Sequence, residues 1–408
     1  MKNKKVIWII NQYASTLETG MGGRHYYFSR EFAKEGHNVY LIGASYHHLL
    51  TNPETNTKPI ESKEVDGFKY ISIDMPRYSH AHSKKRVLGW FRFSYKICKL
   101  RQFIEERPDV IIVSTPSLVS VLGAKYLARK YSAKLIWDIR DIWPLTLTKM
   151  GSINKRHPFI QLLQYIENFA CKHADYITSN WPYANHHLEK RGLEKDNFTW
   201  IPNGFSIEEF EDQDDLDTDF LKNVPKSKFL VVYTGTLGKA NAIDVLLDVA
   251  ELLKNNENIV FLVVGGGKDK SEFELSLQSR NLDNVLYLGT VRKKQIPSVL
   301  ALADLCYVGF RKSSLYEYGN SLNKLPEYLA SGKPIVYSVS SPYKPVDIAK
   351  AGITVPAEDP IKISSAIVEI SRMPKAERQK LGRNGYLYAV ENFEYRVLAK
   401  KFLNIIEG

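Results

Sequence analysis

The sequence is poor in cysteine and contains no long apolar run. Its three cysteines, Cys98, Cys171 and Cys306, are far apart and form no C-x-x-C pair, which excludes a disulfide framework and a cysteine-based zinc site. No stretch reaches the roughly 18 consecutive apolar residues of a membrane-spanning helix, and the N-terminal lysines lead straight into a strand instead of a signal-peptide core. These absences predict a cytoplasmic protein that is at most peripheral to a membrane.

Acidic residues are outnumbered, with 45 Asp and Glu against 56 Lys and Arg and a formal net charge of +11. Such a balance implies an acidic partner, which could be nucleic acid, anionic lipid or a phosphorylated small molecule. The sequence lacks a paired Cys/His finger, an aromatic RNA-binding motif and a long Lys/Arg block. We therefore expect no nucleic-acid partner.

The 408 residues are enough for two domains, and both halves alternate short apolar runs with amphipathic segments. The pattern predicts strands at 5–10, 38–42, 110–114 and 134–138, and then at 229–235, 259–265, 285–288, 305–310, 335–339 and 352–355. Helices are expected between them, for example near 26–34 and 118–130. The fold class is therefore α/β, with two doubly wound Rossmann-like domains that face each other across a ligand-binding cleft.

We place the N-terminal domain at 1–205, a linker at 206–222 and the C-terminal domain at 223–390, and we expect a helix in 391–408 that packs back on the first domain. The linker is acidic and contains Asp212-x-Asp214, which superficially matches the metal-binding D-x-D of some sugar transferases. A D-x-D that holds a metal should end a buried strand, whereas this one lies in a charge run. We interpret it as a solvated linker and expect no metal site.

The segment GNSLNKLPEYLASGKPIV, at 319–336, is the most informative in the chain. It closely resembles the nucleotide-sugar site of family 4 retaining glycosyltransferases of the GT-B fold, especially members that build O-antigens, capsules and other lipid-linked polysaccharides. Further matching motifs follow in the order found in the family: the N-terminal glycine loop, WDIRDIWP at 137–144, PNG at 202–204, YTGTLG at 233–238 and VGGG at 264–267.

The resemblance implies a donor whose diphosphate gains charge as the sugar leaves, so that backbone N–H groups and cations are needed around it. The candidate groups are the glycines Gly22, Gly23, Gly235 and Gly238, and the cations Lys239 and Lys324, with Arg24 as a further cation. A glycine pair after a strand can also be a plain tight turn, and a single lysine is usually solvated. Lys324 stands out because it lies three residues before Glu327 on one helix face.

Glu327 matches the second glutamate of the family's E-x7-E motif, which resembles a clamp on the ribose hydroxyls, and Asn323 lies on the same donor segment. The first glutamate position is Gly319, which departs from the motif. Glu317 is two residues away and would need a shifted backbone to replace it. Which group contacts the sugar hydroxyls is therefore open.

In the first domain, Asp138, Arg140 and Asp141 end an expected buried strand. They could position the acceptor, contact donor hydroxyls, or form a buried ion pair that ties loop to sheet. His47 and His48 follow another strand and could touch the acceptor or be inert, and no Asp or Glu lies at a spacing that would complete a metal site.

Residues 84–101 predict a helix with an apolar stripe beside a basic one. The apolar stripe comprises Trp90, Phe93, Ile97, Leu100 and Ile104, and the basic stripe comprises Lys85, Arg92, Lys96 and Lys99. Core packing is the default explanation for the apolar stripe. The alternative is a surface that docks on anionic lipid and presents a polyprenyl-linked acceptor.

The resemblance implies a retaining hexosyl- or N-acetylhexosaminyltransferase, and together with these features it predicts a metal-independent enzyme without a cofactor, in which Lys324, Lys239, Asp138 and Asp141 act in catalysis. Its expected partners are a nucleotide-sugar donor, with UDP favoured by the resemblance, a saccharide acceptor on a polyprenyl diphosphate, and the anionic inner face of the cell membrane. Two alternatives stay open: an enzyme like the UDP-N-acetylglucosamine 2-epimerases, and a non-catalytic subunit that binds nucleotide sugar or serves as a scaffold.

Overall fold

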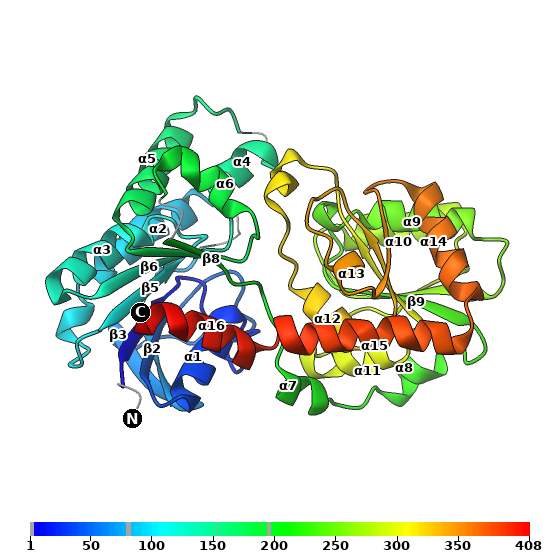
Figure 1. Ribbon diagram of the computed structural model, residues 1–408, viewed down its shortest axis with the longest axis horizontal. Helices are drawn as coiled ribbons and strands as arrows, with labels where there is room; N and C mark the ends of the chain where they lie inside the picture. The colour runs from blue at the N-terminus through cyan, green and yellow to red at the C-terminus, as the bar shows by residue number, and fades with distance from the viewer. Residues whose placement is uncertain (1–3, 79–82, 152, 194–196) are drawn as a thin grey trace. The chain divides into compact units, whose positions relative to one another are not determined.

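The computed structural model describes residues 4–78, 83–151, 153–193 and 197–408. The chain forms two compact units (Figure 1). Unit 1 comprises Met1–Pro202 with Tyr395–Gly408, and unit 2 comprises Asn203–Glu394. The chain therefore passes from one unit to the other twice, at 202–203 and at 394–395.

Unit 1 contains an eight-stranded sheet in the order β3-β4-β2-β1-β5-β6-β7-β8. Its strands are β1 (Val6–Ile10), β2 (Asn38–Ala44), β3 (Ile60–Val65), β4 (Phe68–Ile73), β5 (Val110–Ser114), β6 (Lys134–Ile139), β7 (Tyr176–Ser179) and β8 (Phe198–Trp200). All neighbours pair in parallel except β3, which runs antiparallel to β4. The central strands are continuous apolar runs because helices cover both faces of the sheet.

The helices of unit 1 are α1 (Arg24–Lys34), α2 (Lys84–Ile97), α3 (Ser120–Tyr131), α4 (Leu145–Lys149), α5 (Pro158–His173), α6 (Ala184–Leu188) and α16 (Tyr395–Glu407). Figure 1 shows α2, α3 and α5 together on one face of the sheet, and α1 with α16 on the other. The ring of Tyr395 stacks on Tyr27 at 4.5 Å between centroids, and Phe402 contacts Phe28 edge-on at 5.3 Å. The C-terminal helix is thus part of the core of unit 1.

Unit 2 contains a fully parallel six-stranded sheet in the order β11-β10-β9-β12-β13-β14. Its strands are β9 (Phe229–Thr234), β10 (Ile259–Val264), β11 (Val285–Tyr287), β12 (Leu305–Gly309), β13 (Ile335–Ser338) and β14 (Gly352–Val355). Its helices are α7 (Ile207–Glu211), α8 (Thr218–Lys222), α9 (Ile243–Leu252), α10 (Lys270–Arg280), α11 (Ile296–Ala301), α12 (Lys324–Ala330), α13 (Pro345–Ile348), α14 (Pro360–Arg372) and α15 (Lys375–Asn392). Helices α9, α10 and α14 cover one face, and α11, α12 and α15 lie on the other (Figure 1). The expectation of two doubly wound α/β domains is confirmed.

The acidic segment 206–222 is largely exposed, as its composition suggested, but it is not a linker between the two units. It contains the short helices α7 and α8 and belongs to unit 2. Asp212 pairs with Lys294 at 2.7 Å and Asp214 with Arg292 at 3.2 Å. The basic run 292–294 holds this segment by ion pairs and by the backbone bond from Asp214 N–H to the Lys294 carbonyl, so both carboxylates of the D-x-D already have cationic partners.

Helix α2 buries its apolar stripe, as the core-packing alternative required. Trp90 is 3% exposed, and Phe93 and Ile97 are fully buried. Leu100 and Ile104 continue the stripe into the core. The opposite face of α2 carries a second set of apolar side chains that the expected stripe did not include, namely Leu88, Phe91 and Tyr95, all of them exposed.

Candidate functional site

Two glycine loops meet at the carboxyl ends of β9 and β10 in unit 2. A Cβ on Gly265 would lie 1.8 Å from the Gly235 carbonyl oxygen, and one on Gly267 would lie 2.3 Å from the Leu237 carbonyl oxygen. Gly235 itself has φ 138°, a conformation that favours glycine. The backbones can approach this closely only because no side chain stands between them.

The ammonium of Lys324 lies against this loop. A Cβ on Gly235 would be 2.8 Å from Lys324 Nζ, so the lysine occupies the space that the glycine leaves open. The ammonium donates to Asn241 Oδ1 at 3.3 Å and lies 4.1 Å from the centroid of the Tyr233 ring. No carboxylate of a described residue pairs with it.

Burial lowers the pKa of Lys324 from 10.5 to about 7. Removing an ammonium from water is costly unless a counter-charge accompanies it, and a ring face and one amide oxygen replace only part of its hydration. Perturbed groups of this kind cluster at functional sites. The arrangement favours an anion beside Gly235.

Glu327 lies one turn further along α12 and is half-buried. Burial raises the pKa of its carboxyl group, the Lys293 ammonium opposes this rise, and Glu209 adds to it. Among the described residues, none donates a hydrogen bond to this carboxylate. Its oxygens are therefore available to hydroxyl donors.

The loop before α12 is held by Asn203, whose side-chain amide donates to Ser321 Oγ at 3.0 Å and to Asn323 Oδ1 at 2.8 Å. Asn323 is therefore tied to Asn203 of the PNG motif. Gly319 has φ 90°, so the position that departs from the E-x7-E motif has a backbone conformation that disfavours a glutamate.

Asn320 follows Gly319, and sequence reasoning did not single it out. It is 3% exposed, and its Oδ1 accepts a hydrogen bond from the Tyr337 hydroxyl at 2.8 Å. Its Nδ2 has no partner among the residues that the structure describes. A buried donor without an acceptor costs free energy until something binds it. Only the fold could reveal this, since Tyr337 lies in β13.

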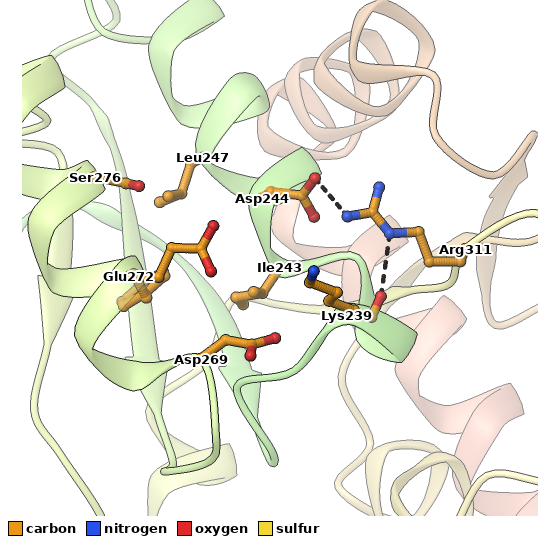
Figure 2. Close-up of a pocket in the computed structure, with 9 residues that line it drawn as sticks. Lys239, Ile243, Asp244, Leu247, Asp269, Glu272, Ser276 and Arg311 are labelled. Atoms are coloured by element: carbon orange, nitrogen blue, oxygen red, sulfur yellow. Dashed lines mark hydrogen bonds and ion pairs between the residues drawn. The ribbon is translucent and has the colours of Figure 1, made fainter. Parts of the chain in front are cut away.

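Lys239 occupies different surroundings from Lys324. It is exposed and lines a pocket at the start of α9 and α10 (Figure 2). Figure 2 shows Asp244, Asp269 and Glu272 around the same hollow, with Arg311 bonded to Asp244 at 2.6 Å and to the Lys239 carbonyl at 3.1 Å. Nearby carboxylates reduce the attraction of an ammonium for a diphosphate, so Lys239 is a weaker candidate cation than Lys324. Gly238 precedes it in extended backbone that any residue could adopt.

Arg24 and Asp138 form a buried ion pair in unit 1. The Arg24 guanidinium donates from Nε and Nη2 to the two carboxylate oxygens at 3.2 and 3.1 Å, and both residues are 1% exposed. Thr178 Oγ1 donates a further bond to Asp138 at 2.8 Å. The charge of Arg24, which the sequence offered as a further cation for the diphosphate, is thus enclosed and paired, and this makes Arg24 a weaker candidate than Lys324. For Asp138, the structure shows a buried ion pair, which was one of the alternatives that the sequence left open.

Arg140 and Asp141 follow Asp138 at the same end of β6, but their side chains are not paired as that of Asp138 is, as far as the described residues show. Thr115 Oγ1 accepts hydrogen bonds from the backbone N–H groups of Arg140 at 2.8 Å and Asp141 at 3.1 Å. Arg140 Nε is buried without a partner among the described residues. Burial raises the pKa of Asp141 against the charge of Arg140, and no described residue hydrogen-bonds to its carboxylate. Both side chains can therefore still engage a ligand.

Gly22 and Gly23 lie directly before α1 with φ of 65° and 79°. A Cβ on Gly23 would meet nothing within 4 Å, whereas one on Gly22 would crowd Leu17 and Tyr26. The structure thus groups the candidate residues into two sets. Lys324, Gly235, Asn323 and Glu327 lie in unit 2, and Gly22, Gly23, Arg140 and Asp141 lie in unit 1.

Comparison with known proteins accounts for most of the chain. Residues 19–209 match the family described as "Glycosyltransferase Family 4", and residues 228–372 match the one described as "Glycosyl transferases group 1". The chain is 25% identical over 320 residues to WcaI of Escherichia coli K12, named as a colanic acid biosynthesis glycosyl transferase. That match covers 76% of this chain and 77% of WcaI.

Solved structures share the fold at low sequence identity. Sucrose-phosphate synthase from Thermosynechococcus elongatus superposes with a TM-score of 0.75 at 16% identity, covering 99% of this chain and 98% of the synthase. Alr3699/HepE of Anabaena, solved in complex with UDP and glucose, gives a TM-score of 0.67 at 13% identity and covers the whole of both chains. These similarities extend over both units and show a common two-domain architecture.

Proposed function

The chain belongs to the family 4 type of glycosyltransferases with the GT-B fold, and from this premise we propose that it transfers a sugar from a UDP-sugar to a lipid-linked saccharide during synthesis of a bacterial surface polysaccharide. The transferred unit is a hexosyl or N-acetylhexosaminyl group. The likeness to WcaI supports the polysaccharide assignment, and the complex of Alr3699/HepE with UDP and glucose supports the choice of nucleotide.

The observation that carries this proposal is the half-buried Lys324 ammonium, which lies at Gly235 and pairs with no carboxylate of a described residue. A diphosphate placed there supplies the missing counter-charge. When the glycosidic bond breaks, the leaving diphosphate gains negative charge, and a fixed cation in a partly desolvated position stabilises it most at that moment. Glu327 accepts the ribose hydroxyls, since its carboxylate has no other donor among the described residues.

The donor sugar lies near Asn320 in this proposal. Gly319 offers no side chain where the family's motif has a glutamate, and Asn320 Nδ2, which has no partner among the described residues, is the next polar group along the loop. A sugar hydroxyl or acetamido oxygen that accepts from Nδ2 would satisfy this buried donor. Asn203 and Tyr337 then act by positioning, because they hold the loop and the amide.

The transfer is retaining and independent of a metal ion. Lys324, with Lys239 in a lesser role, takes the place that a divalent cation has in other sugar transferases. Asp212 and Asp214 are occupied by Lys294 and Arg292, which supports leaving them out of the reaction. Retention requires the acceptor hydroxyl to attack from the face that the diphosphate leaves.

Unit 1 binds the acceptor at the carboxyl ends of its strands. Arg140 and Asp141 are the side chains we assign to it, and the backbone at Gly23, next to Gly22, is open to a ligand. Asp141 suits a proton acceptor because burial raises the pKa of its carboxyl group and so makes the carboxylate more basic. Asp138 supports this edge through its ion pair with Arg24.

The outer face of α2 is the surface we assign to the membrane. Its exposed Leu88, Phe91 and Tyr95 are flanked by the exposed cations Arg92 and Lys99. Apolar side chains next to basic ones are typical of helices that lie on anionic lipid. Within the described residues, no helix is both long and apolar enough to cross a bilayer. A surface contact of this kind would bring unit 1 to the inner face of the membrane, where a polyprenyl-linked acceptor resides.

The test is release of nucleotide from a panel of nucleotide sugars, in EDTA and without added metal. We expect one or a few UDP-sugars to be hydrolysed slowly, and the product to keep the anomeric configuration of the donor when a saccharide acceptor is added. Activity with GDP-sugars alone would refute the nucleotide assignment. Activity that appears only when manganese or magnesium replaces EDTA would refute metal independence.

A further inference from the structure

The hydroxyl group of Tyr13 lies at the carboxyl end of the unit 1 sheet, outside the residues discussed so far. The backbone N–H of Tyr13 donates to Asn11 Oδ1 at 2.7 Å, and the Asn11 amide donates to the Thr115 carbonyl at 3.1 Å. Thr115 is the residue that holds Arg140 and Asp141. The loop after β1 is thus tied to the edge of the sheet that we assign to the acceptor.

Two donors converge on the Tyr13 hydroxyl oxygen. Arg86 Nε donates to it at 2.9 Å and Trp90 Nε1 at 2.8 Å, both from α2. Neither donor can accept a hydrogen bond in return. The phenol proton must therefore point away from both, and no described residue accepts it. Tyr13 thus has an oriented donor that finds no acceptor in the described part of the chain.

The surroundings of this donor are basic and aromatic. From residue 75 to residue 104 the sequence contains eight Lys and Arg and no Asp or Glu. The Arg86 guanidinium lies 5.4 Å from the centroid of the Tyr13 ring, and the ring of His48 contacts Tyr13 edge-on at 5.7 Å. Below them, His47 is 1% exposed and its Nδ1 has no partner among the described residues. An oriented donor in a cationic neighbourhood suits a negatively charged oxygen.

The residues around Tyr13 are connected to Asp141 through Trp90 and Trp143. The ring of Trp90 contacts Trp143 edge-on at 5.2 Å, and the Trp143 backbone N–H donates to the Asp141 carbonyl at 2.9 Å. Helix α2 therefore supplies the residues around Tyr13 on its inner side and the exposed apolar residues on its outer side. An acceptor anchored in lipid at α2 would pass Tyr13 before it reached Asp141.

We propose that the Tyr13 hydroxyl and the Arg86 guanidinium bind an anionic oxygen of the acceptor. This inference rests on the proposed transfer to a lipid-linked saccharide. The oxygen belongs either to a phosphate of the lipid carrier or to a carboxylate of the saccharide. In both cases the phenol donates a hydrogen bond and the guanidinium supplies charge, while Trp90 acts by positioning the phenol.

The test uses the full chain saturated with UDP, so that a diphosphate probe cannot occupy the Lys324 site. Two water-soluble probes are titrated by calorimetry: dimethylallyl diphosphate for the carrier, and methyl glucuronide for an acidic saccharide. We expect one of them to bind, and Tyr13→Phe to weaken that binding about ten-fold or more, with UDP affinity unchanged. Whichever probe binds identifies the source of the oxygen.

Tyr46→Phe is the matched control, because the Tyr46 hydroxyl already donates to the Tyr78 carbonyl at 2.9 Å. It should bind the probe like the wild type. If Tyr13→Phe does not fold, Arg86→Ala replaces it, with the same expected loss. The proposal is overturned if the wild type binds UDP but neither probe, or if Tyr13→Phe or its folded replacement binds the probe as tightly as Tyr46→Phe. Failure of the wild type to bind UDP would instead count against the proposed function.

Discussion

Lys324 carries a free-energy cost in the protein without nucleotide. Its folded-state pKa of about 7 lies below its usual 10.5, so the unfolded chain binds more protons between these two pH values. The lysine therefore lowers the free energy of unfolding by its full amount below pH 7. This destabilisation shrinks as pH rises from about 7 towards 10.5. A residue held at such a cost is best explained by the ligand it binds.

The same pKa predicts how donor use depends on pH. Only the protonated lysine attracts a diphosphate, so kcat/KM for the donor should fall as pH rises through about 7, the pKa of Lys324 in the free protein. Lys324→Arg keeps its charge at all these pH values and should move this fall to higher pH. A kcat/KM profile of the wild type that stays flat from pH 6 to pH 9, or an unshifted fall in the arginine variant, would argue against the assignment.

Lys324 and Glu327 should differ in the step they affect. Loss of the cation removes an interaction that is strongest in the transition state, so Lys324→Ala should lower kcat by about 100- to 1,000-fold, roughly 2.7–4 kcal/mol. A ribose clamp holds substrate and transition state alike, so Glu327→Ala should mainly raise the donor KM and weaken UDP binding.

Steady-state kinetics and UDP titration separate these effects, with circular dichroism to confirm that each variant folds. Lys362→Ala, at an exposed position of α14, serves as a lysine control and should behave like the wild type. Near-normal kcat in Lys324→Ala, or unaltered UDP affinity in Glu327→Ala, would place the donor elsewhere.

At the scale of the element, the sequence of α2 does not separate the side that packs in the core from the side that we propose to contact the membrane. Its residues are apolar on more than one side, and a single pattern cannot tell which side is buried. Packing of α2 against α3 and the core takes Trp90, Phe93 and Ile97, and this leaves Leu88, Phe91 and Tyr95 outside. We therefore propose the exposed residues Leu88, Phe91 and Tyr95 as the apolar part of the membrane surface, in place of the buried stripe that the periodicity indicated.

This face predicts binding to anionic vesicles that weakens with salt. Each basic residue near such a surface contributes about 1 kcal/mol. Arg92→Glu with Lys99→Glu should release the protein from vesicles of phosphatidylglycerol, and Phe91→Ser with Tyr95→Ser should do so at constant charge. The control is Lys375→Glu with Lys380→Glu on α15, an equal charge change in unit 2. Co-sedimentation that responds equally to all three double variants, or to none, would contradict the assignment.

The strands show what an amino-acid pattern can and cannot reveal. Continuous apolar runs predicted β5 and β14 to the residue, and β1, β6, β9 and β10 to within one residue at either end. The edge strand β3, Ile-Glu-Ser-Lys-Glu-Val, was missed because its exposed side chains are polar. The short strands β7 and β8 were missed because three or four residues give too little pattern.

The candidate site was predictable only in part, for a related reason. Lys324, Glu327 and the glycine loops come from contiguous motifs, and the structure brings Lys324 to Gly235. The pairing of Arg24 with Asp138 joins residues 114 positions apart, and no local pattern encodes it. The donors of Tyr13 and Asn320 that find no acceptor among the described residues could be recognised only from the three-dimensional structure.

At the scale of the whole molecule, each unit has its own sheet and core, and the chain returns to unit 1 for its last helix. This return buries Leu398 and Phe402 in unit 1, which should contribute about 1.5–3 kcal/mol for each side chain. We propose that the nucleotide binds to unit 2 and the acceptor to unit 1, so binding of each ligand tests a different unit. Nucleotide binding can therefore be measured without knowledge of the acceptor.

We propose above all that unit 2 binds a nucleoside diphosphate through the half-buried Lys324 ammonium. Calorimetric titration of UDP into the full chain, in EDTA at pH 6.5, tests it most directly, with Lys324→Ala and Lys362→Ala titrated in parallel. We predict one UDP per chain for the wild type and Lys362→Ala, and weaker binding for Lys324→Ala. Wild-type protein that is folded but binds no UDP, or Lys324→Ala that binds UDP as tightly as the wild type, would contradict the account.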